Sequence, residues 1–270
     1  MNEKIRQVVV AGTFYPDNPL TLRKELSERI EIKKNKESPI VLISPHAGYY
    51  YSGSCAGKGF GSINIPDRVI ILGVDHRGSA YPYAIDGHDK WDMPMGQVQV
   101  DFKLRDKLIE KSKIFKIDTN SGLDEHSIEV QIPFLQYLNP KVKILPILIS
   151  GTNYDELQQG GVELAELTKN TEDDILIVAS TDMSHYISSE EAKKKDNLAI
   201  EKIEALSAKE LLNTVIKERI SMCGVLPVVM SLVLAKELGA EETKIIEYTN
   251  SGNISGDYDQ VVGYLSMMLL

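Results

Sequence analysis

Three short, strongly apolar runs constrain the fold of this chain more than any other feature. They occupy residues 39–44, 69–73 and 175–180, and turn-forming residues bound each of them. Continuous aliphatic runs of this length are typical of strands in a parallel sheet whose two faces are both covered. The sequence therefore predicts a buried, mostly parallel or mixed sheet at the centre of the molecule.

The segments around these runs predict how the sheet is covered. Alternating strands and helices are typical of an α/β fold, in which helices flank a central sheet in layers. No stretch has the composition of a linker, so we expect a single layered domain over residues 1–270. Residues 78–99 are expected to be a long loop, with or without a hairpin. Further strands are expected at 142–149, 244–248 and 260–268, and helices at 20–30, 124–138, 199–216 and 225–238.

A histidine follows each of the three apolar runs within a few residues. These histidines are His46, His76 and His185. The loops that leave the carboxyl ends of parallel strands meet at one edge of the sheet, where ligands bind in α/β proteins. Imidazole is the commonest metal ligand and also titrates near neutral pH. We therefore expect the three rings to lie within about 10 Å of one another in a metal or acid/base pocket.

Two other residues have patterns that fit such a pocket. Cys223 stands at the expected start of an apolar helix, where a thiol is activated as the thiolate that binds metals. A small, buried, apolar role explains the same residue equally well. Asp182 precedes His185 by three residues, a spacing at which an aspartate can orient an imidazole, although the spacing also arises by chance.

The remaining polar candidates are less specific. Glu125 and His126 lie just before an expected helix, and acidic residues there are explained by the helix dipole alone. The sequence leaves open whether either of them contributes to the site. Cys55 has small neighbours that indicate close helix packing, and His88 lies in a polar stretch typical of the surface.

Composition excludes several functions. The formal net charge is −9 and no basic patch is visible, so nucleic acid is not an expected partner. The apolar runs are too short to span a bilayer, and nothing resembles a signal peptide. Two cysteines do not make a disulfide framework. We expect a cytoplasmic protein without a membrane partner. A P-loop, a dinucleotide fingerprint, an HExxH motif and a nucleophile elbow are all absent.

Taken in order, the distinctive segments resemble the Memo family over nearly the whole chain. The matching blocks are Ala11-Gly12-Thr13-Phe14-Tyr15-Pro16, Pro45-His46-Ala47-Gly48-Tyr49, Leu72-Gly73 through His76, Trp91-x-x-Pro94-x-Gly96, Asp124 to Leu135, Ser180 to Tyr186, Cys223-Gly224, and Thr249-Asn250-Ser251-Gly252 to Gly263-Tyr264.

This resemblance implies a fold like that of the class III, LigB-type extradiol dioxygenases, which hold Fe(II) with two histidines and a carboxylate. By motif, His46 and His76 would be the histidine ligands and Cys223 would take the third place. His185 would be the acid/base residue with Asp182 beside it, and Glu125 and His126 would lie around the cofactor. A thiolate in place of the carboxylate keeps Fe(II) as the first candidate and adds copper and zinc.

Two functions of different classes follow from the resemblance. One is a non-heme iron or copper oxidoreductase of dioxygenase type, acting on an unidentified small substrate. The alternative is a non-catalytic protein that sequesters metal or binds a peptide in a vestigial pocket, and metal-assisted hydrolysis is a weaker third reading. In prokaryotes the resemblance also implies association with an AMMECR-type protein and a radical SAM protein. Ring cleavage does not follow from the fold, because one fold hosts many chemistries.

Overall fold

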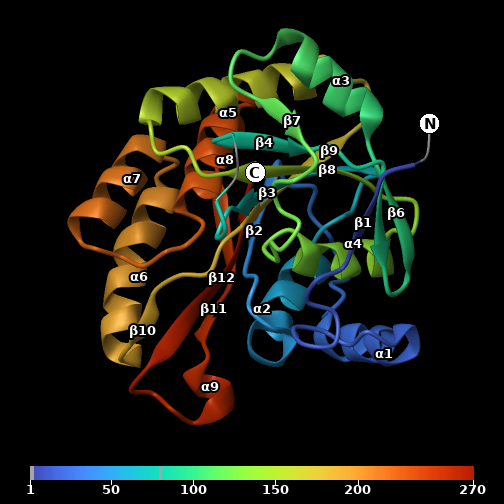
Figure 1. Cartoon of the computed structure of the whole chain (residues 1–270). Coiled ribbons are helices and arrows are strands. Elements are labelled where there is room, and N and C mark those ends of the chain that lie inside the picture. Colours follow the sequence, from blue (N-terminus) through green and yellow to red (C-terminus); the bar gives the residue numbers. More distant parts are fainter. Residues whose placement is uncertain (1–2, 79–80) are drawn as a thin grey trace.

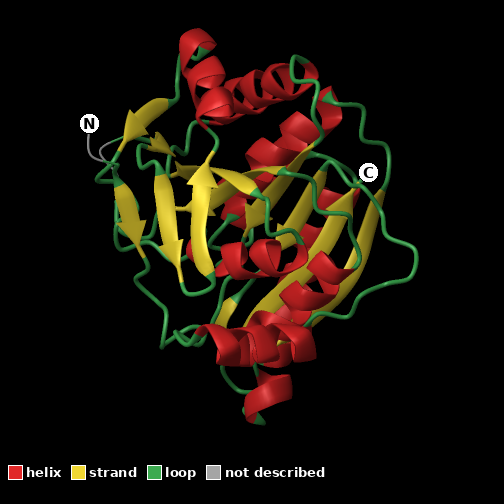
Figure 2. Ribbon diagram, turned by 90° about the vertical axis from the view of Figure 1, so that its right-hand side faces the viewer, coloured by secondary structure: helices red, strands yellow, loops and turns green. Residues whose placement is uncertain are grey.

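A large mixed sheet organises the molecule in the computed structural model, which describes residues 3–78 and 81–270 (Figure 1). In that part of the chain the strands form one sheet of 12, in the order β1-β5-β6-β8-β3-β9-β2-β12-β10, with β11 paired to β12, β4 paired to β7 and β8. Helices cover both faces (Figure 2). The strands are β1 (Ile5–Gln7), β2 (Val41–Ser44), β3 (Arg68–Val74), β4 (Tyr83–Asp86), β5 (Lys90–Met93), β6 (Gly96–Val100), β7 (Lys116–Asp118), β8 (Lys143–Ile149), β9 (Ile175–Ser180), β10 (His185–Ile187), β11 (Thr243–Asn250) and β12 (Val261–Leu269).

The centre of the sheet is parallel, as the apolar runs predict. Strands β8, β3, β9 and β2 pair in parallel, with Val74 opposite Ile149 and Ser44 opposite Ser180. Strand β12 runs antiparallel to both β2 and β11, so the sheet as a whole is mixed. The carboxyl ends of four neighbouring strands therefore lie along one edge.

Side chains that alternate along the central strands enter two separate cores. Ile70 and Leu72 of β3 belong to one core, and Val69 and Ile71 belong to the other. Because both faces are covered, each of these side chains is fully buried. Burial of a large aliphatic side chain contributes about 1.5–3 kcal/mol, which explains why uninterrupted apolar runs were needed here.

The helices divide between the two faces. Helices α1, α2 and α4 contribute to the core that contains Val69, and α3, α5, α6, α7 and α8 contribute to the other. The Asn18 side chain accepts hydrogen bonds from the backbone N–H groups of Leu20 and Thr21, which caps α1. The helices are α1 (Pro19–Arg29), α2 (Tyr49–Gly61), α3 (Phe102–Lys111), α4 (Ile132–Leu138), α5 (Tyr154–Lys169), α6 (Ser189–Glu204), α7 (Ala208–Lys217), α8 (Val225–Glu237) and α9 (Gly252–Ser255).

Small residues of α2 allow it to approach α1 closely, as expected around Cys55. A Cβ atom at Gly57 would lie 2.3 Å from the carbonyl oxygen of Arg29, so no larger residue fits there. Cys55 itself is buried, and its Sγ lies 3.8 Å from the carbonyl oxygen of Glu247. Its packing role agrees with the sequence-based expectation.

The helix expected over residues 124–138 begins later than predicted. A single 3₁₀ turn covers Glu129–Gln131 and the α-helix follows from Ile132. Upstream, the Ser127 hydroxyl accepts from the backbone N–H of Val74 and donates to the carbonyl of the same residue. These bonds tie the segment to the end of β3, and a helix there would break them.

The helix expected over 199–216 is in fact two helices, α6 and α7. Helix α6 starts ten residues earlier, where Ser188 caps it by accepting from the backbone N–H of Glu191. Leu206 has a φ of 50° between the two helices. A left-handed residue cannot continue a right-handed helix, so the chain turns at this point.

The segment 78–99 is not a long loop, but it does contain the hairpin that the sequence allowed for. Strand β4 and the β5–β6 hairpin extend the sheet here, and residues 79 and 80 lie outside the described part. The expectation that His88 lies at the surface is wrong. Its Nδ1 lies 2.6 Å from the Asp86 carboxylate, and only 8% of the residue is exposed.

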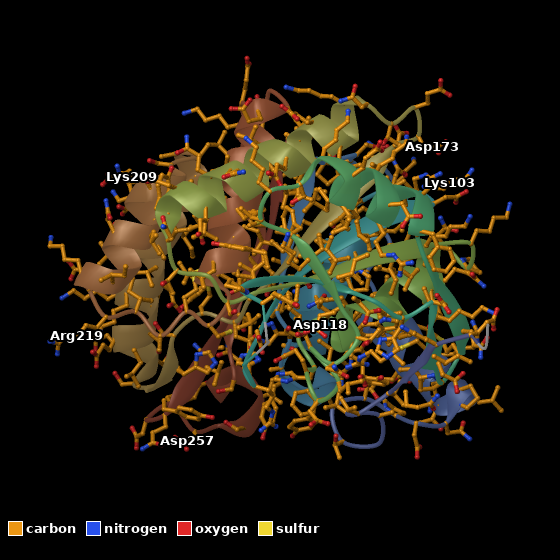
Figure 3. All side chains as sticks on the ribbon, turned by 45° about the horizontal axis from the view of Figure 1, so that its top comes forward. Lys103, Asp118, Asp173, Lys209, Arg219 and Asp257 are labelled. Atoms are coloured by element: carbon orange, nitrogen blue, oxygen red, sulfur yellow. The ribbon has the colours of Figure 1, made fainter. Side chains whose placement is uncertain are left out.

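Charged side chains project from the outer surface, including Lys103 of α3 and Lys209 of α7 (Figure 3). Over residues 3–78 and 81–270, none of the helices has both the length and the apolar character that crossing a bilayer requires.

Candidate metal centre

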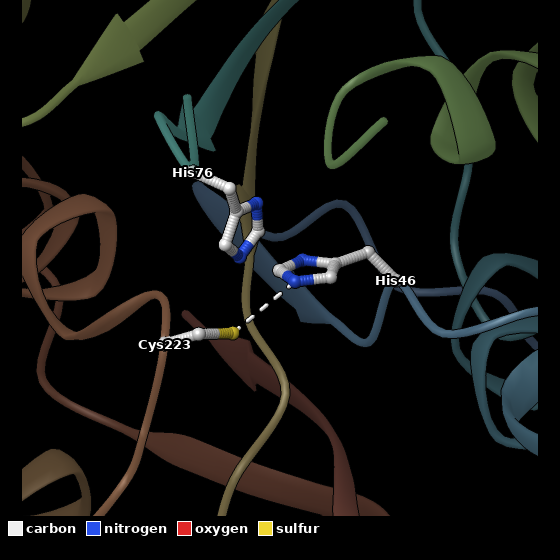
Figure 4. Close-up of side chains that lie close together, drawn as sticks. All are labelled: His46, His76 and Cys223. Carbon is white, nitrogen blue, oxygen red and sulfur yellow. Dashed lines mark hydrogen bonds between the residues drawn. The ribbon is translucent and has the colours of Figure 1, made fainter. Parts of the chain in front are cut away.

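Three of the candidate ligands meet beyond the carboxyl edge of the sheet. His46 follows the end of β2 by two residues, and His76 follows the end of β3 by two residues. Cys223 comes from the segment between α7 and α8 and reaches the same place (Figure 4). One ligand atom from each of the three lies within 4.8 Å of the other two. Segments nearly 180 residues apart in the sequence are thus brought together by the order of the strands.

The pocket is buried on the side of His46 and Cys223. His46 Nε2 lies 3.1 Å from Cys223 Sγ, and the rings of His46 and His76 are 5.4 Å apart, edge to face. A tetrahedral metal bound to sulfur at about 2.3 Å and nitrogen at about 2.05 Å separates these donors by about 3.3–3.6 Å. His46 Nε2 and Cys223 Sγ therefore need to move only a few tenths of an ångström to suit such an ion, and the His76 donor lies within 4.8 Å of both. On spacing and on donor chemistry, the residues fit a transition metal.

Burial keeps His46 neutral. Desolvation, followed by the effect of the neighbouring His76, lowers the pKa of His46 to about 3. A neutral imidazole has a lone pair available for a metal, whereas an imidazolium has none. The electrostatics of the pocket thus favour the form of His46 that can act as a ligand.

The carboxylate of Glu125 supports His76. It lies 3.0 Å from His76 Nδ1 and also accepts the backbone N–H groups of His76, His126 and Ser127. Burial by itself would raise the pKa of Glu125, but these hydrogen bonds, His76 first, hold it at about 2. The same bond raises the pKa of His76. Glu125 therefore stays ionised. Because it holds Nδ1 of His76, the Nε2 atom of that ring faces away from the carboxylate.

A third imidazole in this cluster belongs to His126. Its ring stacks on that of His76 at 4.9 Å with an interplanar angle of 12°, and it lies 5.4 Å from the ring of His46. Phe14 packs against its other side, with ring centroids 4.8 Å apart. Desolvation lowers the pKa of His126 to about 4. His76, Glu125 and His126 also form a second group whose ligand atoms lie within 4.8 Å of one another.

His46 and His76 converge, as the sequence predicted, and His185 lies near enough for its charge to contribute to the lowered pKa of His46. The structure adds the ring of His126, whose part in the site the sequence left open. In the described part of the chain, the ring in contact with those two belongs to His126, while His185 has its ring 5.9 Å from that of Tyr186. The backbone N–H of His185 donates to Ser221 Oγ, and its Nδ1 bonds to the carbonyl of Ser221. His185 thus lies beside the segment that carries Cys223, at the partly exposed side.

Asp182 braces His46 rather than His185. Its Oδ1 accepts the backbone N–H of His46 at 2.8 Å, whereas Nδ1 of His185 is engaged by Ser221. Burial raises the pKa of Asp182. The Asp-x-x-His spacing therefore reflects two residues of one loop that face different partners.

The thiol of Cys223 is not activated by its place before α8. Burial first, and then the nearby Asp182, raises its pKa, so the metal-free site favours the protonated thiol. Of the two roles that the sequence left open for Cys223, the raised pKa argues against activation by the helix end and agrees with desolvation of the thiol. The Sγ atom accepts the backbone N–H of Asp182 at 3.3 Å, which orients it.

Comparisons with known proteins show the family to which the chain belongs. A family model described as Memo-like protein matches residues 6–268. A MEMO1 family protein of Aquifex aeolicus is 41% identical over 273 residues, covering 99% of this chain and 100% of that protein. A MEMO1 family protein of Thermotoga neapolitana is 37% identical over 284 residues, covering 98% and 99%.

A solved structure supports the fold alone. The crystal structure of an uncharacterized protein from Escherichia coli K12 matches with a TM-score of 0.51 at 15% identity. It covers 86% of this chain and 100% of that chain. Identity at this level carries no information about the chemistry of the site.

Proposed function

This chain belongs to the Memo-like protein family, and we propose that it binds one transition-metal ion through His46, His76 and Cys223 and uses it as an oxidoreductase on a small substrate. The observation that carries the proposal is the meeting of these three donors, each from a different segment, within 4.8 Å. Fe(II) is the first candidate, and copper and zinc suit the same two imidazoles and one thiolate. A bound redox metal would supply the electron transfer and O₂ chemistry that side chains lack.

The side chains around the donors supply binding and proton transfer. Because Nδ1 of His185 bonds to the carbonyl of Ser221, that nitrogen carries the proton and Nε2 keeps a lone pair. His185 can therefore accept a proton at Nε2 from a substrate hydroxyl and return it later. The packed rings of His126 and Phe14 lie beside the donors and restrict how a substrate approaches.

A second candidate function is metal sequestration or peptide binding without turnover. The observation that favours it is the identity of the third donor, which is a partly buried thiol and not a carboxylate. A thiolate holds copper or zinc tightly, and the open positions that catalysis requires are then not needed.

The decisive experiment is metal analysis of protein purified without oxygen, with the variants His46→Ala, His76→Ala and Cys223→Ser. Each variant should lose most of its bound metal. Cys55→Ser is the matched control, because Cys55 is also a buried thiol but packs against β11. Retention of metal by Cys223→Ser would refute the assignment of the third ligand. Oxygen uptake by the loaded wild type, tested on panels of small reductants, then separates the oxidoreductase from the sequestering protein.

A further inference from the structure

The hydroxyl of Ser180 has three polar contacts but only one proton to give. Ser180 Oγ lies 2.7 Å from the carbonyl oxygen of Ser127, 2.9 Å from Gln131 Nε2 and 2.9 Å from His46 Nδ1. Ser180 and Gln131 are fully buried, so water takes no part in these contacts. The direction of each bond can therefore be worked out from the chemistry of the partners.

Two of the three directions are fixed by carbonyl groups. The carbonyl of Ser127 can only accept, so the Ser180 hydroxyl proton lies on that bond. Gln131 Nε2 also lies 2.9 Å from the carbonyl of Pro45, which identifies that end of the amide as the NH₂ group. Gln131 thus donates to Pro45 and to Ser180. The hydroxyl oxygen has only lone pairs left for His46.

The remaining contact determines the state of His46. A bare Nδ1 at 2.9 Å would place two lone pairs against each other and leave both groups unsatisfied in a buried site. Nδ1 must therefore carry the proton. An imidazole that is protonated at Nδ1 and acts as a ligand has its lone pair on Nε2, and Nε2 is the atom 3.1 Å from Cys223 Sγ.

We propose that Ser180 is the positioning residue that sets the tautomer of His46 and so aims its Nε2 lone pair at the metal position. This places Ser180 in the role for His46 that Glu125 has for His76, with a neutral hydroxyl in place of a carboxylate. The consequence for metal affinity rests on the function proposed above, whereas the tautomer itself does not.

The same short segment of chain anchors both ligand histidines. Glu125 bonds to His76. Two residues later, the carbonyl of Ser127 accepts a hydrogen bond from the hydroxyl of Ser180, and Ser180 in turn contacts His46. Gln131, in the 3₁₀ turn that follows, braces the same hydroxyl. Ser127 and Gln131 thus help to hold His46 although neither is a candidate metal ligand.

The test is a measurement of the His46 tautomer by long-range ¹H–¹⁵N correlation NMR on reduced, metal-free protein, with His46 assigned by comparison with His46→Gln. The wild type should show Nδ1 protonated and Nε2 bare. Ser180→Ala should show a mixture of both tautomers. It should also bind Zn²⁺ about 10–100-fold more weakly in chelator competition, the usual effect of losing a residue that orients a ligand.

Ser44→Ala is the matched control. Ser44 pairs with Ser180 across the sheet and is equally buried, but its Oγ has no hydrogen-bond partner among the described residues. It should keep both the tautomer and the Zn²⁺ affinity of the wild type.

A wild-type His46 protonated at Nε2 would overturn the proposal without any variant. A Ser180→Ala protein that keeps the wild-type tautomer would overturn it as well. A protein with the expected tautomer that binds no metal would instead contradict the function proposed for the site and leave the role of Ser180 toward His46 intact.

Discussion

Replacement of Glu125 by glutamine is the sharpest test of how this pocket is held together. The carboxylate accepts the Nδ1–H of His76 and three backbone N–H groups, and only 2% of the residue is exposed. Glutamine has one acceptor oxygen, so its NH₂ group must face at least one of these donors. The variant therefore loses a charge-assisted bond to His76 and leaves a buried N–H unsatisfied.

Two independent routes give the magnitude. A hydrogen bond to a charged group contributes about 1.5–3 kcal/mol, and an unsatisfied buried donor costs about 1–3 kcal/mol. Separately, a Glu125 pKa lowered from 4.5 to about 2 corresponds to about 3 kcal/mol of stability at neutral pH. Both routes predict that Glu125→Gln lowers the free energy of unfolding of the metal-free protein by about 3 kcal/mol.

The pH dependence has a definite sign. An acid whose pKa is lowered by folding stabilises the protein fully above its unfolded value, and this contribution is lost as the pH falls through its folded value. The difference between wild type and Glu125→Gln should therefore be full at pH 7 and shrink between about pH 4.5 and pH 2. That window is the contribution of Glu125 itself. His76 adds a second one, because Glu125 raises its pKa: this part is full below the unfolded value of about 6.5 and is lost as the pH rises through the raised folded value.

The assay is urea unfolding of the two metal-free proteins, followed by near-UV and far-UV circular dichroism at several pH values. Glu163→Gln is a suitable control, because this partly exposed carboxylate accepts from Ser112 and Lys113 at the surface. It should change the free energy of unfolding by less than about 1 kcal/mol. A difference below about 1 kcal/mol for Glu125→Gln at pH 7 would refute the reasoning.

Three further predictions concern the same end of the molecule. His185→Ala should keep metal near the wild-type level, unlike His46→Ala, while any turnover falls about 10²–10⁴-fold; equal metal loss in both would make His185 a direct ligand. Cys223→Asp recreates two histidines and one carboxylate, so catechol cleavage, followed by the absorbance of the ring-opened product, should appear in this variant if the pocket retains latent dioxygenase chemistry. Activity in the variant alone would favour the sequestering function for the wild type. Gly263→Ala should lower Tm by several degrees, since a Cβ there would lie 2.3 Å from Oδ2 of Asp196 in α6. An unchanged Tm would show that α6 shifts freely to accommodate the methyl group.

The boundaries that sequence patterns could not place are those set by distant partners. The expected helix over 124–138 has acceptable helical periodicity, yet its first residues bond to the end of β3 through Ser127. The competing partner of Ser127 lies on another strand, where local propensity gives no signal. His88 stands among polar residues and is nevertheless buried, with its Nδ1 on the Asp86 carboxylate two residues away.

The sequence by itself determined the central strands and the edge at which His46 and His76 meet. Burial on both faces demands continuous apolar runs, and parallel strands send their following loops to one side. Only the tertiary structure decided the rest of the pocket. It brings His126 into contact with His76, turns Asp182 toward His46, and buries Cys223 so that its thiol pKa rises. The physical reason is that ring contacts, hydrogen-bond direction and desolvation depend on groups far apart in the chain, which no local pattern encodes.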